Sequence, residues 1–155
     1  MVVQDIQQYS EIRPKARAYF CYLFQKNLPN HLPSVSIETL TSRLLKIRGD
    51  LKDLEAAYLL DAKGNQVTPT YLKNGKKEED IGENRSTRAY YYRAMKERRC
   101  TITDPYPSLL NDELTVTASE PIFDEHGEIV YVACIDLPLA EVLRIAHPLA
   151  SETAA

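Results

Sequence analysis

The segment LTVTASEPIFDEHGEIVYVACID, residues 114–136, decides the fold of this chain. Two runs rich in β-branched and apolar residues, 114–122 and 129–136, flank the polar sequence FDEHG at 123–127. Strand-forming runs joined by a short turn that contains glycine predict an antiparallel β-hairpin. Pro138 follows closely and suits the first turn of a last helix, which we expect over residues 139–145.

Upstream of this hairpin the apolar residues follow a helical period. Residues 1–30 place Ala16, Phe20 and Leu23 on one face, and Pro14 is expected to break or kink this helix. Residues 28–36 contain two prolines and predict a loop. Ser36 is then a plausible N-cap for a second helix that ends at Gly49.

After Leu54 the spacing of the apolar residues changes from a helical period to one typical of strands. Residues 55–61, the turn AKGN at 62–65 and residues 66–70 predict a second hairpin, followed by a charged loop over 73–80. Residues 86–99 return to a helix with Ser86 or Thr87 as its cap, and a further strand region surrounds Ile102. Antiparallel hairpins with helices grouped around them indicate an α+β domain.

The composition fits one ordinary domain. The chain has 155 residues, 44% of them hydrophobic and 26% charged, and a net charge of −3 spread along its length. No basic face favours nucleic acid, and no apolar run approaches the length of a membrane span. Because the sequence as given shows no secretory signal, the chain is expected in the cytoplasm. An excised extracellular receptor domain, placed in the periplasm or outside the cell, has the same appearance.

The three cysteines carry a separate expectation. Cys21, Cys100 and Cys134 are widely spaced and form no CxxC pair, so neither a zinc knuckle nor a disulfide framework is predicted. Cys134 lies in an apolar run and is expected to be a small core residue. The pattern weakly favours thiols in a reducing compartment.

Four short blocks between Leu54 and Ile145 carry a resemblance to a known family. They are LDAKG (60–64), RSTRAYY (85–91), ITDPY (102–106) and TVTASEPIFD (115–124), and in this order and spacing they resemble the Cache family of PAS-like sensor domains. The resemblance implies a five-stranded antiparallel sheet with a long N-terminal helix and a short C-terminal helix. It divides the chain into an N-terminal helical segment (1–53), a sensor core (54–146) and a disordered tail (147–155).

The resemblance also implies a ligand site closest to that of the amino-acid-binding and organic-acid-binding members. The residues assigned to it are Arg88, Tyr90, Tyr91, Tyr106, Ser108, Thr117 and Asp136. A guanidinium such as that of Arg88 pairs with a carboxylate through two parallel hydrogen bonds, tyrosine hydroxyls add donors, and Asp136 suits an ammonium group. Two positions depart from the family pattern: Glu83 replaces a tyrosine, and Ser108 replaces an aspartate.

Each of these residues can also have a purely structural role that involves no ligand. Arg88 lies among other arginines and suits a solvated helix face, while Tyr90 and Tyr91 suit the core or the surface. Tyr106 can stiffen a proline-framed loop, and Asp136 can cap the last helix. His31, His126 and His147 are far apart, and the acidic cluster around Gly127 indicates a charged hairpin tip.

These observations predict a sensor rather than an enzyme. The sequence contains no nucleophile elbow, metal-binding helix motif or phosphate loop, and no cofactor is expected. We expect a domain that recognises a small carboxylate-bearing molecule and signals through its terminal helices to a partner protein. The resemblance implies a homodimer through the N-terminal helix. The alternative is a ligand-free dimerisation or scaffold module of the same fold.

Overall fold

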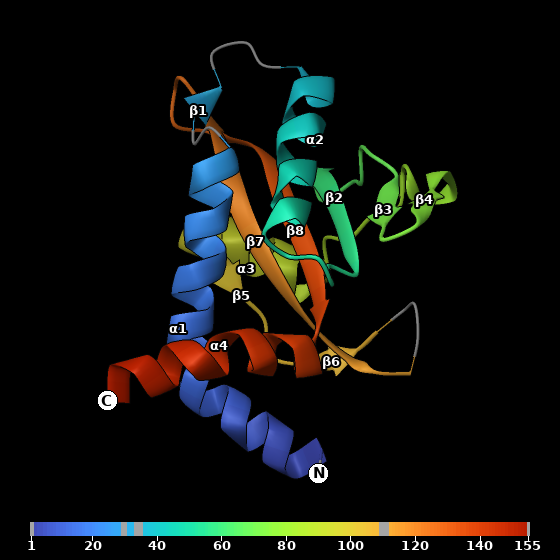
Figure 1. The fold of residues 1–155 in the computed structure, drawn as a ribbon. Helices are drawn as coiled ribbons and strands as arrows, with labels where there is room; N and C mark the ends of the chain where they lie inside the picture. Colours follow the sequence, from blue (N-terminus) through green and yellow to red (C-terminus); the bar gives the residue numbers. More distant parts are fainter. Residues whose placement is uncertain (1, 29–30, 33–35, 109–111, 155) are drawn as a thin grey trace.

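A computed structural model describes residues 2–28, 31–32, 36–108 and 112–154 (Figure 1). The helices are α1 (Val2–Asn27), α2 (Ile37–Leu45), α3 (Ala89–Glu97) and α4 (Leu139–Ala154), with short 3₁₀ turns η1 (Lys46–Gly49) and η2 (Glu78–Asp80). The strands are β1 (His31–Leu32), β2 (Ala56–Asp61), β3 (Thr70–Leu72), β4 (Gly75–Lys77), β5 (Thr101–Ile102), β6 (Tyr106–Pro107), β7 (Leu114–Asp124) and β8 (Ile129–Pro138).

The strands form one sheet built around the long β7–β8 hairpin. Its order is β1-β7-β8-β2-β3-β4, and β5 and β6 also pair with β7. All pairings between described strands are antiparallel except that of β1 with β7. The register places Thr117 opposite Asp136 and Ala56 opposite Asp136 on its other side. Three strands therefore meet where β8 ends.

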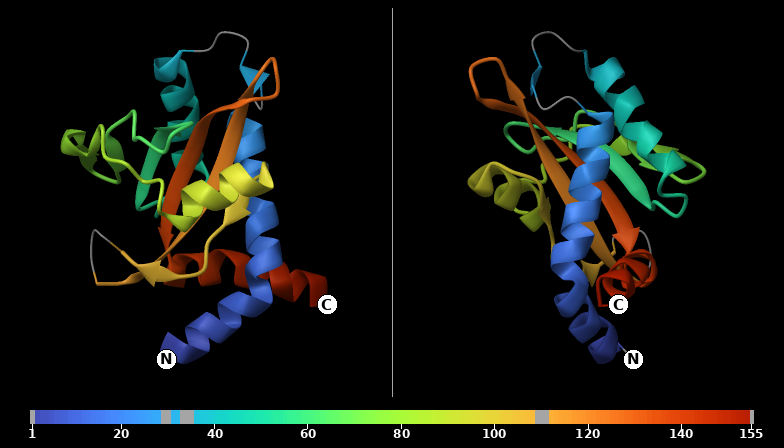
Figure 2. Two further views of the ribbon diagram at one scale, coloured as in Figure 1. Left: turned by 180° about the vertical axis from the view of Figure 1, so that it is seen from behind. Right: turned by 60° about the vertical axis from the view of Figure 1, so that its left-hand side comes forward.

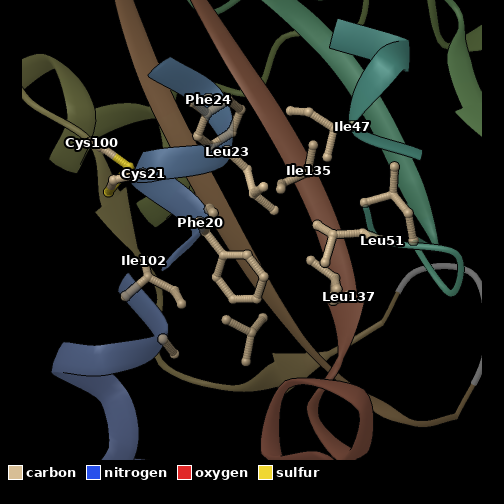
Figure 3. Packing of buried hydrophobic residues seen from close by; sticks show 14 of the residues in the cluster. Phe20, Cys21, Leu23, Phe24, Ile47, Leu51, Cys100, Ile102, Ile135 and Leu137 are labelled. Atoms are coloured by element: carbon tan, nitrogen blue, oxygen red, sulfur yellow. A yellow bond between two sulfur atoms is a disulfide. The ribbon is translucent and has the colours of Figure 1, made fainter. Parts of the chain in front are cut away.

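Helices cover the two faces of the sheet unequally. α1, α2 and α4 lie on one face, and α3 lies on the other (Figures 1 and 2). Side chains of β7 and β8 alternate between two apolar clusters, one beneath α1 and one beneath α3. In the larger cluster Phe20, Leu23 and Phe24 of α1 pack toward Ile135 and Leu137 of β8 (Figure 3).

The first helix bends in its N-terminal part (Figure 1). Pro14 lies inside α1, and a proline there removes one helical hydrogen bond and crowds the preceding turn, which accounts for the bend. The expected kink is therefore present, although the helix is continuous. The segment before it is fixed by Tyr9, whose hydroxyl donates to the carbonyl of Thr103 at 2.7 Å.

The α+β, PAS-like fold predicted from the sequence is confirmed. Ser36 caps α2 by accepting a hydrogen bond from the Thr39 amide at 3.2 Å, and Gly127 (φ +78°) closes the β7–β8 turn. The sheet has eight strands among the described residues rather than five, because several two- and three-residue segments join it. Only part of the predicted loop 28–36 is described, and His31–Leu32 within it form β1.

Several local predictions are wrong. Residues 73–80 do not form a simple loop, because they contain β4 and η2. The helix predicted over 86–99 begins at Ala89, and its N-cap is Arg88 rather than Ser86 or Thr87. The helix predicted over residues 139–145 is too short, because α4 continues to Ala154 through the segment predicted as a disordered tail (147–155). The division at residue 54 stays a prediction.

The expectation of three thiols is also wrong. Cys21 of α1 and Cys100, just before β5, form a disulfide across 79 positions of sequence, while Cys134 is a buried free cysteine as expected. Within the described ranges, no helix combines the length and apolar character needed to cross a bilayer.

Candidate functional site

A cavity of about 310 Å³ opens on the α3 face of the sheet, near the end of β8. This volume lies at the lower end of the range for small-molecule sites. Every residue that lines it carries a polar or ionisable side chain, and these residues come from the sheet, from the β3–β4 region and from the start of α3: Tyr58, Gln66, Thr70, Lys77, Asp80, Glu83, Arg85, Arg88, Tyr90, Tyr106, Ser108, Thr115 and Asp136.

Asp136 lies at the point where β2, β7 and β8 meet. Its Oδ1 accepts hydrogen bonds from Tyr58 Oη at 3.0 Å and Thr117 Oγ1 at 2.8 Å. Burial raises the pKa of Asp136 to about 7, the nearby Glu55 charge adds to the rise, and the two hydrogen bonds oppose it. Both bonds use Oδ1, no hydrogen bond of the other oxygen is found among the described residues, and Asp136 lines the cavity.

Three tyrosines surround this carboxyl. The Tyr58 and Tyr90 rings meet edge to face at 5.9 Å, and the Tyr90 and Tyr106 centroids lie 6.4 Å apart. The Tyr106 hydroxyl is hydrogen-bonded to Thr117 Oγ1. Burial raises the pKa of all three phenols, so they remain protonated donors at neutral pH.

Arg88 supplies a positive charge to the same cavity. It is the N-cap of α3, with extended backbone angles (φ −84°, ψ 140°), and its guanidinium lies 5.8 Å from the centroid of the Tyr106 ring. Among the described residues no hydrogen bond or ion pair of this side chain is found. A half-buried guanidinium of this kind is available to a carboxylate.

The segment that carries Arg88 is positioned by a close approach to the β2 turn. Gly64 has φ +87°, and its carbonyl accepts the Arg85 amide at 2.7 Å. A Cβ at Gly64 would lie 3.0 Å from backbone and side-chain atoms of Ser86, so a side chain here forces the segment outward.

A second polar group forms another wall of the cavity. Thr70 Oγ1 donates to Asp80 Oδ2 at 2.6 Å and accepts from Gln66 Nε2 at 2.8 Å. Arg85 completes the network through Gln66 Oε1 at 3.3 Å and Asp80 Oδ1 at 3.9 Å. Arg85 is therefore paired, which distinguishes it from Arg88.

The structure brings most of the residues predicted from the sequence to one place. Those that line the cavity are Arg88, Tyr90, Tyr106, Ser108 and Asp136. Thr117 lies behind the lining and holds both Asp136 and Tyr106. Tyr91 does not line the cavity, because its hydroxyl donates to the carbonyl of Ala62 on the β2 turn.

The two positions that depart from the family pattern have clear surroundings. Glu83 is exposed at the edge of the cavity. Ser108 Oγ donates to Glu55 Oε1 at 2.7 Å, and Thr115 Oγ1 donates to Glu55 Oε2 at 3.4 Å. A carboxylate from the start of β2 thus lies beside the position where the pattern has an aspartate.

Several cavity residues were missed by sequence reasoning. Tyr58 could have been found, because Ala56, Tyr58 and Leu60 alternate onto the α3 face of a predicted strand. Gln66, Thr70, Lys77 and Asp80 carry no such signal, since they lie in short or irregular segments whose path depends on tertiary contacts.

The arrangement combines an arginine that has no carboxylate partner in the described part of the chain, a ring of tyrosine donors and a half-buried acid. Such a cavity can bind a small molecule that carries both a carboxylate and a cation. The described residues hold no cluster of three or more potential metal ligands.

The chain is similar to known sensor domains both in sequence and in fold. Residues 47–143 match the family model described as methyl-accepting chemotaxis protein-like, first PDC sensor domain. The fold is similar to the sensory domain of the Campylobacter jejuni chemoreceptor Tlp3 with isoleucine bound, at 18% identity and a TM-score of 0.65, over 92% of this chain and 58% of that chain.

Two further structures have the same fold. The ligand-binding domain of the Pseudomonas aeruginosa PAO1 amino-acid chemoreceptor PctC, in complex with GABA, has 18% identity and a TM-score of 0.58, over 92% of this chain and 60% of that chain. The Bacillus subtilis YkuI protein, which has an EAL domain, has 20% identity and a TM-score of 0.64, over 88% of this chain and 35% of that chain.

One curated protein is also similar in sequence. It is a citrate (Re)-synthase of Syntrophus aciditrophicus (strain SB), 25% identical over 104 residues, which are 64% of this chain and 16% of that protein. The chain thus spans a small part of this relative and about a third to three fifths of the three solved structures.

The family match covers more than half of the chain and includes the β7–β8 hairpin, α3 and the floor of the cavity. The chain belongs to the family of methyl-accepting chemotaxis protein-like first PDC sensor domains.

Proposed function

We propose that this domain senses a small molecule that carries a carboxylate and an ammonium group, such as an amino acid. One observation carries the proposal: Arg88 and Asp136 line the same cavity, and among the described residues Arg88 has no acidic partner and Oδ2 of Asp136 has no hydrogen-bond donor. In this arrangement Arg88 binds the carboxylate and Asp136 accepts the ammonium. The bound ligands of Tlp3 and PctC, isoleucine and GABA, have both groups.

The domain acts by binding and not by turnover in this proposal. Ligand binding shifts the population between two conformations according to its different affinity for each. The readout runs through α4, which follows β8 directly, and through α1, which packs against α4. A downstream kinase, cyclase or chemotaxis module is the proposed partner.

We also propose that the domain works outside the reducing cytoplasm, as the sensory part of a receptor. The Cys21–Cys100 disulfide supports this, because such bonds persist mainly in oxidising compartments. A homodimer through α1 is part of the same proposal, and the exposed Ile6 (43%) and Tyr22 (57%) on this helix support it. Sedimentation of the purified domain at several concentrations tests the dimer.

The ligand-free scaffold remains the second candidate. Its support is the pair of departures at Glu83 and Ser108, since Ser108 is engaged by Glu55 rather than left open to a ligand. A ligand-free scaffold dimerises but binds no amino acid, hydroxy acid or amine.

Calorimetric titration distinguishes the two candidates. An amino-acid panel is compared with matched hydroxy acids, which lack the ammonium, and with matched amines, which lack the carboxylate. We expect a heat of binding only when both groups are present. Arg88→Ala should weaken every hit by roughly tenfold or more, because a charge-assisted pair contributes about 1.5–3 kcal/mol.

The control is Arg43→Ala, which removes an exposed arginine on α2, away from the cavity. It should bind as the unmodified protein does. Equal affinity of Arg88→Ala and Arg43→Ala for a hit would remove Arg88 from the site, and a panel without any hit would favour the scaffold.

A further inference from the structure

A second cavity lies on the α1 side of the molecule, between α1, β7 and the segment that joins α3 to β5. Its volume is about 390 Å³, and its lining shares no residue with the first cavity. The lining residues that matter here are Arg17, Cys21, Arg98, Arg99, Cys100 and Glu120.

The Cys21–Cys100 disulfide forms part of this lining and cross-links α1 to the segment just before β5 (Figure 3). The two cysteines are 9% and 5% exposed, and the cavity leads from solvent to both. Thr101 pairs with Ser119 across β5 and β7, so Cys100 lies opposite Glu120 in the extension of the same ladder.

Glu120 is an unusual residue to find beside a disulfide. Its side chain is buried at 6% exposure, and Oε2 is the one buried side-chain oxygen or nitrogen among the described residues without a hydrogen-bond partner. Burial raises the pKa of Glu120 to about 7, and Arg17 opposes the rise. A buried polar atom left unpaired is costly, and its persistence points to a role for the group.

Three arginines make the mouth of this cavity positive. Arg17 donates from Nε and Nη2 to the Cys100 carbonyl at 3.0 and 2.8 Å. Arg98 stacks on Phe123 at 5.1 Å, and Arg99 is exposed, 3.4 Å from Glu97. A positive mouth attracts small anions, and positive charge beside a sulfur stabilises its thiolate.

We propose that this cavity binds small anionic thiols, that such a thiol exchanges with the Cys21–Cys100 disulfide, and that Glu120 supplies the proton to the sulfur that leaves. The incoming thiolate attacks Cys21 Sγ, a new S–S bond forms, and the Cys21–Cys100 bond breaks. The electron pair of that bond goes to Cys100 Sγ, which takes the proton of Glu120. A second thiolate then attacks the small-molecule sulfur of the mixed disulfide, and the bond to Cys21 Sγ breaks. Cys21 leaves as a thiolate that takes a proton from water, and the two small thiols leave joined as their disulfide.

The overall step is balanced, because two small thiols are oxidised to their disulfide while the protein disulfide is reduced to two thiols. The exchange removes the one disulfide cross-link found in the described part of the chain, which joins α1 to the segment just before β5. It does not depend on ligand binding at the first cavity, so either proposal can fail alone.

The test uses the full oxidised chain and three simple thiols that differ in charge. They are 2-mercaptoethanesulfonate (anionic), 2-mercaptoethanol (neutral) and cysteamine (cationic), compared at equal thiolate concentration and low salt. Free cysteines are trapped with an alkylating reagent and located by mass spectrometry. We expect the anionic thiol to open the bond at least about tenfold faster than the cationic thiol, since electrostatic steering changes such rates by 10–10³.

Two variants and one control probe the residues. Glu120→Gln keeps the shape but has no proton to give, and it should slow exchange by at least about tenfold. Arg99→Gln should reduce the preference for the anionic thiol, whereas Lys96→Gln, which removes an exposed charge of α3 outside the cavity, should not.

Cys134 serves as an internal control, because it is 0% exposed and lies in the cluster beneath α3. Its alkylation in step with Cys21 and Cys100 would mean that the bond opens only through unfolding, and that result overturns the proposal. Equal rates with all three thiols, or an unchanged rate in Glu120→Gln, overturns it as well.

Discussion

Replacing Asp136 by asparagine removes a charge that the folded protein holds at a cost. The folded state raises the pKa of this carboxyl from 3.8 to about 7, mainly by burial. Because the folded pKa is the higher one, the folded state binds an additional proton between about pH 4 and pH 7. The wild-type domain therefore loses stability as the pH rises through this window.

The size of the effect follows from the shift. About three pKa units at 1.36 kcal/mol each give about 4 kcal/mol of destabilisation above pH 7. Asparagine avoids this cost, and its side-chain oxygen can still accept the hydrogen bonds of Tyr58 and Thr117. We expect Asp136→Asn to be more stable than the wild type by about 2–4 kcal/mol at pH 8 and nearly equal to it at pH 4.

The assay is urea unfolding followed by far-ultraviolet circular dichroism, since the chain contains no tryptophan. Glu125→Gln removes the same charge from the exposed hairpin tip and controls for net charge. The wild type keeps some pH dependence from Glu120, which is unchanged in Asp136→Asn. A variant that is less stable than the wild type at pH 8, or a difference that does not vary with pH, would refute the reasoning.

Three further predictions concern binding and stability. An ammonium-bearing ligand should bind about tenfold more weakly at pH 6 than its plateau above pH 8, because Asp136 must be ionised to accept it, and a titration without this change would exclude Asp136 as the partner. Gly64→Ala should lower the affinity for the same ligand, because the new side chain displaces the Ser86–Arg88 segment. Gly49→Ala, whose Cβ has open space around it, should leave the affinity unchanged, and calorimetry compares the two variants. The double variant Cys21→Ser and Cys100→Ser should lose about 4 kcal/mol of unfolding free energy, and a loss below about 1 kcal/mol would show that the bond contributes little.

Elements with a strong local signal could be predicted from the sequence. The β7–β8 hairpin has alternating apolar residues and a glycine with positive φ at its turn, and α2 has a serine cap, so both lie where expected. The candidate site was reached through short blocks of sequence rather than through any periodic pattern. The family resemblance that these blocks carry named five residues that line the cavity, and three of them, Arg88, Tyr90 and Tyr106, stand in the blocks themselves.

What the sequence did not reveal depends on contacts between distant segments. Ser86 does not cap α3, because the helix begins only at Ala89 with Arg88 as its N-cap, and Ser86 instead donates to Asn84 Oδ1 from its amide, at 3.0 Å, and from its hydroxyl. Cys21 and Cys100 are joined only because α1 crosses the start of β5, which no spacing rule reveals. Tyr91 shares the sequence block of Arg88 and Tyr90, but its position on α3 directs it to the β2 turn.

The connection between Asp136 and α4 has a mechanical consequence. Only Leu137 and Pro138 separate this acid from the first residue of the helix, Leu137 is 1% exposed, and the proline ring fixes its own φ. The connection between β8 and α4 is therefore too short and too rigid to absorb a small movement of the strand end. We therefore expect that a ligand which displaces the strand end tilts the whole of α4, as a rigid lever turns about a pivot at the sheet.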